Sequence, residues 1–274
     1  VFDKDEEVRR AVHSLGLADQ VAETARDAVA GADIVILATP IGAVRPVLEQ
    51  IAPHFAEGAI VSDVGSVKAA VAQAFAELLP PGVVGLPAHP VAGTEQSGPQ
   101  AGFAELFQDR WCILTPGAAP AEAQERLRAF WERMGAKVEI MDAEHHDKVL
   151  AVTSHLPHLI AYTIVGVASD LEQVTEAEVV KYSAGGFRDF TRIAASDPTM
   201  WRDIFLSNKD AVLELLGRFT EDLIALQRAI RWEDGERLHD HFERTRSIRR
   251  GVIETGQDTA QPDFGRRERP KDAS

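Results

Sequence analysis

The residues best suited to chemistry in this chain lie at positions 89–98, shortly after the strand-like run at 83–86. This segment, HPVAGTEQSG, places an imidazole, hydroxyl groups and a carboxylate between glycines. An imidazole titrates near neutral pH, which makes His89 the first candidate for proton transfer. Loops that follow the strands of an open α/β sheet lie at its carboxyl edge, where such folds bind ligands. We therefore predict that His89 lies on a loop and is catalytic.

Strand and helix patterns alternate around this segment. Strand-like runs occur at residues 34–38, 59–63, 83–86, 111–115 and 137–141, and the first of them, IVILA, is an uninterrupted apolar run typical of a buried parallel strand. Helical patterns lie near residues 5–15, 24–30, 43–53, 67–78 and 120–134. The alternation predicts an α/β fold, with a doubly wound, Rossmann-like domain over residues 1–142.

Beyond residue 142 the pattern changes to 3.6-residue periodicity without convincing strands. Residues 143–255 are therefore predicted to form an all-α domain, and residues 256–274, which have almost no apolar side chains, a disordered tail. The helical half has more apolar surface than one small domain readily buries, as residues 211–226 illustrate. We expect a homodimer formed through these helices.

The first residues read as the end of a strand that enters a helix. We expect the chain to lack the first strand of the fold and its glycine-rich loop, the segment that brings a pyrophosphate close to a helix N-terminus. Asp3 would then end the second strand, where an acidic side chain binds the ribose diol of NAD and repels the 2′-phosphate of NADP. A structural alternative makes Asp3 a helix N-cap.

Composition excludes several classes of protein. With 45% hydrophobic and 26% charged residues, the 274-residue chain has the make-up of a soluble globular protein. No window has the roughly 18 uncharged apolar residues of a membrane span, so no membrane association is expected. The single cysteine, Cys112, rules out an internal disulfide and favours the cytoplasm. A formal charge of −14 argues against nucleic-acid binding.

Four segments, taken in order, resemble the prephenate and arogenate (cyclohexadienyl) dehydrogenase family of tyrosine biosynthesis. They are residues 63–68 (DVGSVK), 89–98, 153–158 (TSHLPH) and 185–203. The resemblance covers residues 1 to about 254. It implies oxidative decarboxylation of prephenate or arogenate: a hydride passes from the ring carbinol carbon to NAD, with NADP the less favoured cofactor, and carbon dioxide leaves as the ring becomes aromatic.

The same resemblance implies roles for individual residues. His89 would accept the ring hydroxyl proton, Ser66 would orient that hydroxyl or the nicotinamide carboxamide, and Arg192 would bind a substrate carboxylate with its planar fork. Further substrate contacts are expected at Thr94, Glu95, His146, His158, Asp189 and Trp201. Cofactor contacts are expected at Asp3, Thr39, Pro40, Asp63 and Ser66.

Structural roles compete for several of these residues. Ser66 precedes a helical pattern and could be its N-cap, while Asp189 could form an ordinary surface ion pair with Arg188. The histidines and Trp201 could be core or capping residues. His155 and His158 have helical i, i+3 spacing, but no His-Glu-x-x-His motif or cysteine set accompanies them, so no metal site is predicted.

Two other functions stay open from sequence. One is a different dehydrogenase with a Rossmann domain and a helical dimer, although such enzymes lack the His89 segment paired with the Arg192 motif. The other is a noncatalytic dimeric binding protein, which would apply if the chain truly starts at Val1.

Overall fold

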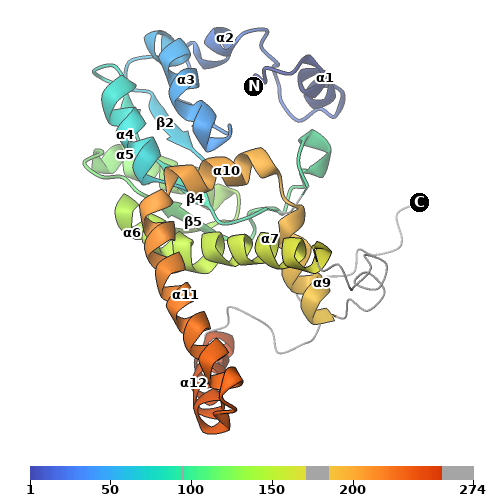
Figure 1. Ribbon diagram of the computed structural model, residues 1–274. Coiled ribbons are helices and arrows are strands. Elements are labelled where there is room, and N and C mark those ends of the chain that lie inside the picture. The colour runs from blue at the N-terminus through green and yellow to red at the C-terminus, as the bar shows by residue number, and fades with distance from the viewer. Residues whose placement is uncertain (94–95, 171–184, 255–274) are drawn as a thin grey trace. The chain divides into compact units, whose positions relative to one another are not determined.

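The computed structural model describes residues 1–93, 96–170 and 185–254 (Figure 1). The predicted substrate contacts Thr94 and Glu95 and the predicted tail at 256–274 lie outside these residues. The chain forms two compact units, one comprising Val1–Leu215 and the other starting at Leu216. Every described candidate residue belongs to the first unit.

The first unit alternates short strands and helices before it becomes helical. Its strands are β1 (Ile34–Leu37), β2 (Ile60–Asp63), β3 (Val84–Gly85), β4 (Ala88–Pro90), β5 (Trp111–Leu114) and β6 (Lys137–Ile140). The helices among them are α1 (Glu6–Ser14), α2 (Ala25–Val29), α3 (Ile41–Ile51), α4 (Ala69–Leu78) and α5 (Ala121–Arg133), with 3₁₀ turns at Ala52–His54 and Pro99–Ala101. The later helices are α6 (Ala143–Leu150), α7 (Leu156–Ser169), α9 (Gly185–Thr191) and α10 (Pro198–Ser207), with a π turn at Ala151–His155 and a 3₁₀ turn at Arg192–Ala195. The last described helices are α11 (Lys209–Arg231), which crosses into the second unit, and α12 (Gly235–Glu254).

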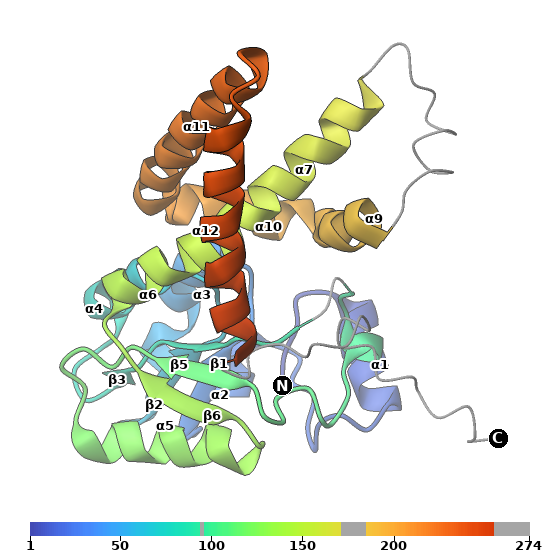
Figure 2. The ribbon, with the colours of Figure 1, turned by 90° about the horizontal axis from the view of Figure 1, so that it is seen from below.

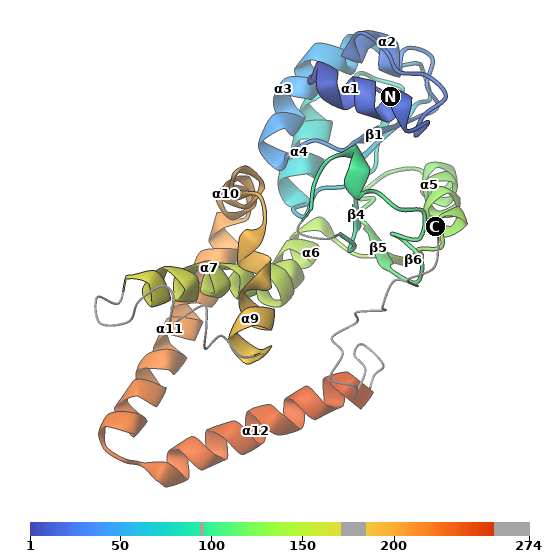
Figure 3. The same cartoon turned by 90° about the vertical axis from the view of Figure 1, so that its right-hand side faces the viewer.

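The strands form two three-stranded sheets (Figure 3). β1, β2 and β3 are parallel in that order, as the alternating pattern predicts. The second sheet has the order β4, β5, β6, in which β5 and β6 are parallel but β4 runs antiparallel to β5. A crossover between parallel strands usually contains an α-helix. The described part of the β4–β5 connection contains only the short 3₁₀ turn Pro99–Ala101, which is consistent with an antiparallel pair. The α/β class is confirmed, but not a uniformly parallel sheet.

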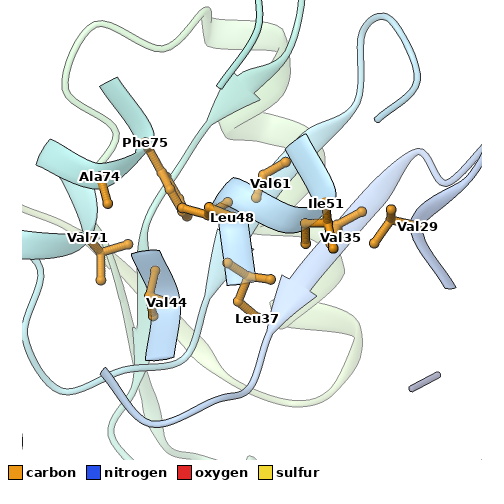
Figure 4. Close-up of a cluster of buried hydrophobic side chains, with 10 residues drawn as sticks. All are labelled: Val29, Val35, Leu37, Val44, Leu48, Ile51, Val61, Val71, Ala74 and Phe75. Carbon is orange, nitrogen blue, oxygen red and sulfur yellow. The ribbon is translucent and has the colours of Figure 1, made fainter. Parts of the chain in front are cut away.

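Helices cover both faces of the strands. On one face α2, α3 and α4 pack on β1 and β2 through ten buried apolar side chains (Figure 4). On the other face α5 covers the strands of the second sheet (Figure 2), and its Leu127 and Trp131 belong to the same buried cluster as Leu114 of β5. Hydrophobic burial on this scale stabilises the layers at roughly 25 cal/mol per Å² of apolar area. The carboxyl ends of β1 and β2 are thereby fixed on a rigid base.

Residues 1–5 contain no strand, contrary to the sequence pattern. The Val1 backbone instead bonds to Gln20 and Ala22 in the loop after α1. The α1 N-cap is Asp5, whose carboxylate accepts from the Glu7 N–H at 2.8 Å. Asp3 therefore is not the cap that sequence offered as an alternative.

The helical run Ala143–Ser169 corrects the expectation that the chain has no apolar segment of membrane-spanning length. It has 27 residues and contains an 18-residue window with a mean hydropathy of 1.4, so it is long and apolar enough to cross a membrane by length and composition alone. Its first half, however, carries the buried polar residues His146, Asp147 and His155, which hydrogen-bond to other elements of the first unit. Buried, hydrogen-bonded polar groups identify this first half as part of a protein core, whereas Ile164, Val165 and Val167 in the second half are exposed. The π turn precedes Pro157, which lacks the N–H needed for a regular helical bond.

Candidate active site

His89 lies in strand β4 and is buried, with 7% of its surface exposed. In the antiparallel ladder it stands opposite Ile113 of β5. The prediction that His89 lies on a loop is therefore wrong. The ladder continues to Val91, whose N–H donates to the Trp111 carbonyl at 2.7 Å, and the glycine-containing loop starts only after it.

A buried ion pair between Lys68 and Asp63 holds the backbone just before His89. The Lys68 ammonium donates to the Ala88 carbonyl at 2.7 Å, and Asp63 Oδ1 accepts from the Ala88 N–H at 3.2 Å. Both polar groups of Ala88 are thus fixed. The Gly65 N–H donates to Asp63 Oδ2 at 2.8 Å, and a Cβ at Gly65 would come within 2.9 Å of that oxygen, so glycine is needed there.

The structure does not support the predicted cofactor contact of Asp63. Its carboxylate is buried and accepts hydrogen bonds from Lys68, Gly65 and Ala88, so protein groups already occupy both of its oxygens. Burial raises the pKa of Asp63 and lowers the pKa of Lys68, an effect larger than their mutual attraction. We interpret the pair as a structural support for His89.

His146 links His89 to Asp147. Helix α6 begins at Asp142, whose carboxylate accepts from the backbone N–H groups of residues 144 and 145, and this start turns His146 and Asp147 inward. His146 Nε2 lies 2.8 Å from His89 Nδ1, and His146 Nδ1 lies 2.8 Å from Asp147 Oδ1. His146 is fully buried and both its nitrogens are bonded, so the structure does not support its predicted contact with substrate.

Asp147 lies on α6 but caps the N-terminus of helix α4. Its carboxylate accepts from the N–H groups of Lys68 (2.7 Å) and Ala69 (2.9 Å), a role that sequence offered to Ser66. Within the described residues the half-buried Ser66 hydroxyl has no hydrogen-bond partner. Ser66, at the carboxyl end of β2, thus keeps a hydroxyl available for a ligand.

Burial and nearby positive charge lower the pKa of His89 well below its usual value of 6.5. The largest cause is desolvation, followed by the positive charge of Lys68, and a proton on His89 would also be repelled by any proton charge on the neighbouring imidazoles of His146 and His155. His89 is therefore neutral at neutral pH and has a lone pair available to accept a proton. No hydrogen bond to its Nε2 is found within the parts of the chain that the structure describes.

A second buried histidine supports the same cluster. The Asn208 amide donates to the Asp147 carbonyl at 2.8 Å and lies 3.1 Å from His155 Nδ1. Burial lowers the pKa of His155 to about 4, so its ring is neutral. α6, the π turn and α10 are thereby joined around Asp147.

His158, Trp201 and Arg192 gather on the helical side. The His158 ring stacks on Trp201 with centroids 3.6 Å apart, and His158 Nδ1 donates to the Ser154 carbonyl at 2.9 Å. Burial lowers the pKa of His158, and the Arg192 charge lowers it further, which places that guanidinium nearby. Trp201 is held because α10 starts with the Asp197 N-cap and Pro198. His158 and Trp201, two of the predicted residues, are thereby in contact, and Arg192 lies close enough for its charge to act on His158.

Asp189 fits the structural alternative better than the predicted substrate contact. Its carboxylate pairs with Arg188 at 3.4 Å on the surface of α9. No interaction between Asp189 and the histidine cluster is found within residues 185–254 or the other described parts. The described residues contain no group of three or more His, Cys, Asp or Glu side chains that could hold a metal ion.

The carboxyl end of β1 offers groups that fit a nucleotide. The Thr39 hydroxyl is buried and has no hydrogen-bond partner among the described residues, and Pro40 starts α3 without a side-chain cap. Thr39 and Ser66 follow neighbouring parallel strands, the place where α/β sheets bind dinucleotides. Asp3 is half-buried, and its Oδ1 accepts from the Asp5 N–H at 2.8 Å, which leaves Oδ2 for a ligand.

Sequence profiles decide the family. The profile of the prephenate dehydrogenase nucleotide-binding domain matches residues 1–140, and that of the prephenate dehydrogenase dimerization domain matches residues 142–244. The chain belongs to the prephenate dehydrogenase family. The resemblance inferred from four short segments is thus confirmed, as is the plan of a Rossmann-like domain followed by a helical one.

Individual family members agree with this assignment. Cyclohexadienyl dehydrogenase of Zymomonas mobilis is 45% identical over 250 residues, which cover 91% of this chain and 85% of that protein. Prephenate dehydrogenase of Bacillus subtilis is 34% identical, over 92% of this chain and 68% of that protein. Among solved structures, prephenate dehydrogenase of Aquifex aeolicus with hydroxyphenyl propionate and NAD+ is 33% identical, with a TM-score of 0.82 over 92% of this chain and 87% of that one.

Four residues of this prephenate dehydrogenase family site were not predicted as site residues. They are Lys68, Asp147, His155 and Asn208. Lys68 was visible as part of the DVGSVK motif, and Asp147 as the neighbour of His146. Nothing in the sequence indicates that both are buried, because charged side chains are mostly exposed.

Proposed function

We propose that this chain oxidises and decarboxylates prephenate, arogenate or both, with NAD as the hydride acceptor. The observation that carries the proposal is a buried, neutral His89 linked through His146 to Asp147, beside the carboxyl ends of β1 and β2. The family assignment supplies the reaction class, and the geometry supports a base at this position.

His89 accepts the proton of the ring hydroxyl through Nε2, the nitrogen that does not face His146. Removing this proton drives hydride departure from the carbinol carbon, because electron density moves from oxygen into the forming carbonyl. Loss of carbon dioxide then produces a phenolate, to which the imidazole returns the proton. Ser66 is placed to orient the hydroxyl, since its own hydroxyl is half-buried at the neighbouring strand end.

Thr39, Pro40, Ser66 and Asp3 would hold the dinucleotide at the carboxyl edge of the parallel sheet. NAD, when bound, supplies the electron-deficient ring that takes the hydride. The orphaned Thr39 hydroxyl supports this placement, since a buried hydroxyl without a partner is costly unless a ligand or water satisfies it. The acidic side chain of Asp3 supports a preference for NAD over NADP.

Arg192, with His158 and Trp201 beside it, forms the proposed binding site for a substrate carboxylate. Arg192→Gln is expected to raise KM for the substrate by about 10- to 100-fold, the value of one charged hydrogen-bonding group, while kcat changes less. Steady-state kinetics against substrate concentration measures this. Arg188→Gln, on the neighbouring surface helix, is the matched control and should leave KM within about two-fold. Equal effects of the two changes would contradict the role of Arg192.

The proposed activity is tested by assaying the full-length protein, extended upstream of Val1 through a complete first strand, with prephenate and with arogenate, each with NAD and with NADP, and following reduced nicotinamide by its absorbance. We expect turnover with NAD and at least one of the two substrates. Binding of the cofactor without turnover on either substrate would favour another dehydrogenase, and no cofactor binding at all would favour a noncatalytic binding protein.

We further propose that the enzyme is a cytoplasmic homodimer whose functional domains are residues 1–142 and 143–255. The match to a dimerization domain over residues 142–244 supports the dimer. So do the large apolar side chains exposed on α11 and α12, namely Leu213, Leu223, Ile230, Phe242 and Ile248. The buried cysteine thiol of Cys112 supports a reducing compartment.

A further inference from the structure

Three side chains from two elements form a buried line that ends at the proposed base. Asp147 and His146 lie on α6, and His89 lies on β4. The two links between them are both 2.8 Å, and none of the three residues is more than 7% exposed. Such short contacts between buried polar groups are hydrogen bonds in which each proton has a definite place.

The proton positions follow from the Asp147 end of the line. Asp147 accepts N–H bonds from Lys68 and Ala69 at its two carboxylate oxygens, as the ionised form does. A carboxylate only accepts, so the His146 nitrogen that faces it, Nδ1, carries a proton. In a neutral His146 ring the other nitrogen, Nε2, is then an acceptor. It receives the proton that His89 carries on Nδ1.

We propose that His146 and Asp147 are positioning residues that hold His89 in the Nδ1–H tautomer, so that Nε2 presents its lone pair to the substrate hydroxyl. This inference rests on the proposed function. A neutral imidazole in the other tautomer would present an N–H to the hydroxyl and could not accept its proton. Asp147 has a second task, because the same carboxylate caps α4 and thereby places the Lys68 that supports Ala88.

The groups around His89 favour a neutral ring. Lys68, at the start of α4, faces His89 together with its partner Asp63, which lies at the end of β2. His146 and Asp147 face it from α6. His155 faces it from the π turn. The line to Asp147 therefore selects between two neutral tautomers. It does not serve to charge the imidazole.

The tautomer can be measured without any substrate. In protein labelled with ¹⁵N-histidine, the signals of His89 are assigned by their loss in His89→Asn. We expect an N–H type signal for Nδ1 and an unprotonated signal for Nε2, and in His146→Phe a shift of population toward the Nε2–H form. A wild-type His89 that is protonated on Nε2 would overturn the proposal whether or not the protein folds after substitution.

Kinetics separates positioning from substrate contact. His146→Phe should lower kcat by about 10- to 100-fold, part of what a general base contributes, with KM within about two-fold. His145→Phe makes the same change one residue earlier, on the exposed face of α6, and should leave both values unchanged. A raised KM with an unchanged kcat would overturn the proposal by making His146 a substrate-binding residue. If wild-type protein oxidises neither substrate, the proposed function fails, and the tautomer measurement still decides the role of His146 and Asp147.

Discussion

His89→Asn is expected to lower kcat by about 10²- to 10⁴-fold, the usual contribution of a general base, while KM changes by less than about three-fold. Asparagine suits this test because its amide nitrogen can take the place of Nδ1 and keep the bond to His146. Only the outward nitrogen, Nε2, is lost. Stopped-flow or steady-state measurement of reduced nicotinamide provides kcat and KM for both proteins.

The pH profile adds an independent reading of the same substitution. Burial and nearby positive charge lower the pKa of His89 below 6.5, so wild-type kcat should be constant near neutral pH and fall only as His89 becomes protonated at lower pH. His89→Asn should lack that acidic decrease. His145→Asn, at an exposed position, should keep the wild-type profile. A His89→Asn variant with an unchanged acidic limb would show that another group is the base.

The pattern of the chain predicted most of the elements that carry the site. Strand-like runs located β1, β2, β5 and β6 to within about a residue at each end. The apolar residues of β1 suit a strand covered on both faces, whereas β6 alternates charged and apolar residues and is mostly exposed. The three-residue strand β4 was not predicted. It is held as a strand by pairing with β5, residues that lie about twenty positions further along the chain, and by the Asp63–Lys68 pair.

Candidate residues were easier to identify than their roles. Residue type and order singled out His89, Ser66 and Arg192, whose chemistry is suited to a proton, a hydroxyl and a carboxylate. The roles expected for Asp63 and His146 differ in the structure because both side chains are buried and bonded to protein groups. Burial depends on tertiary packing. The local sequence around a carboxylate does not show whether that carboxylate faces solvent or a buried lysine.

Lys68→Met is expected to destabilise the fold by about 3–5 kcal/mol, because it leaves the Asp63 carboxylate buried without its counter-charge. Methionine keeps a similar length and an unbranched shape, so the loss comes from charge and hydrogen bonding more than from volume. The Ala88 carbonyl also loses its donor, and kcat should fall because β4 is less well held next to His89. Urea unfolding followed by circular dichroism measures the stability. Lys148→Met, at an exposed position on α6, should change it by less than about 0.5 kcal/mol.

The pH dependence of Lys68→Met identifies the cause of that loss. Attraction to Lys68 and its hydrogen bond are the main influences that lower the pKa of Asp63, so without them burial raises this pKa further above that of the unfolded chain. A group whose pKa is raised by folding stabilises the folded state while it is protonated, and this stability is lost as pH rises through the folded pKa. The deficit of the variant relative to wild type should therefore be smaller at about pH 5 than at about pH 8. Adding Asp63→Asn should recover part of the loss at the higher pH, because the buried charge itself is then gone. A deficit that is independent of pH and unchanged in the double variant would mean that packing, and not the unpaired carboxylate, accounts for the effect.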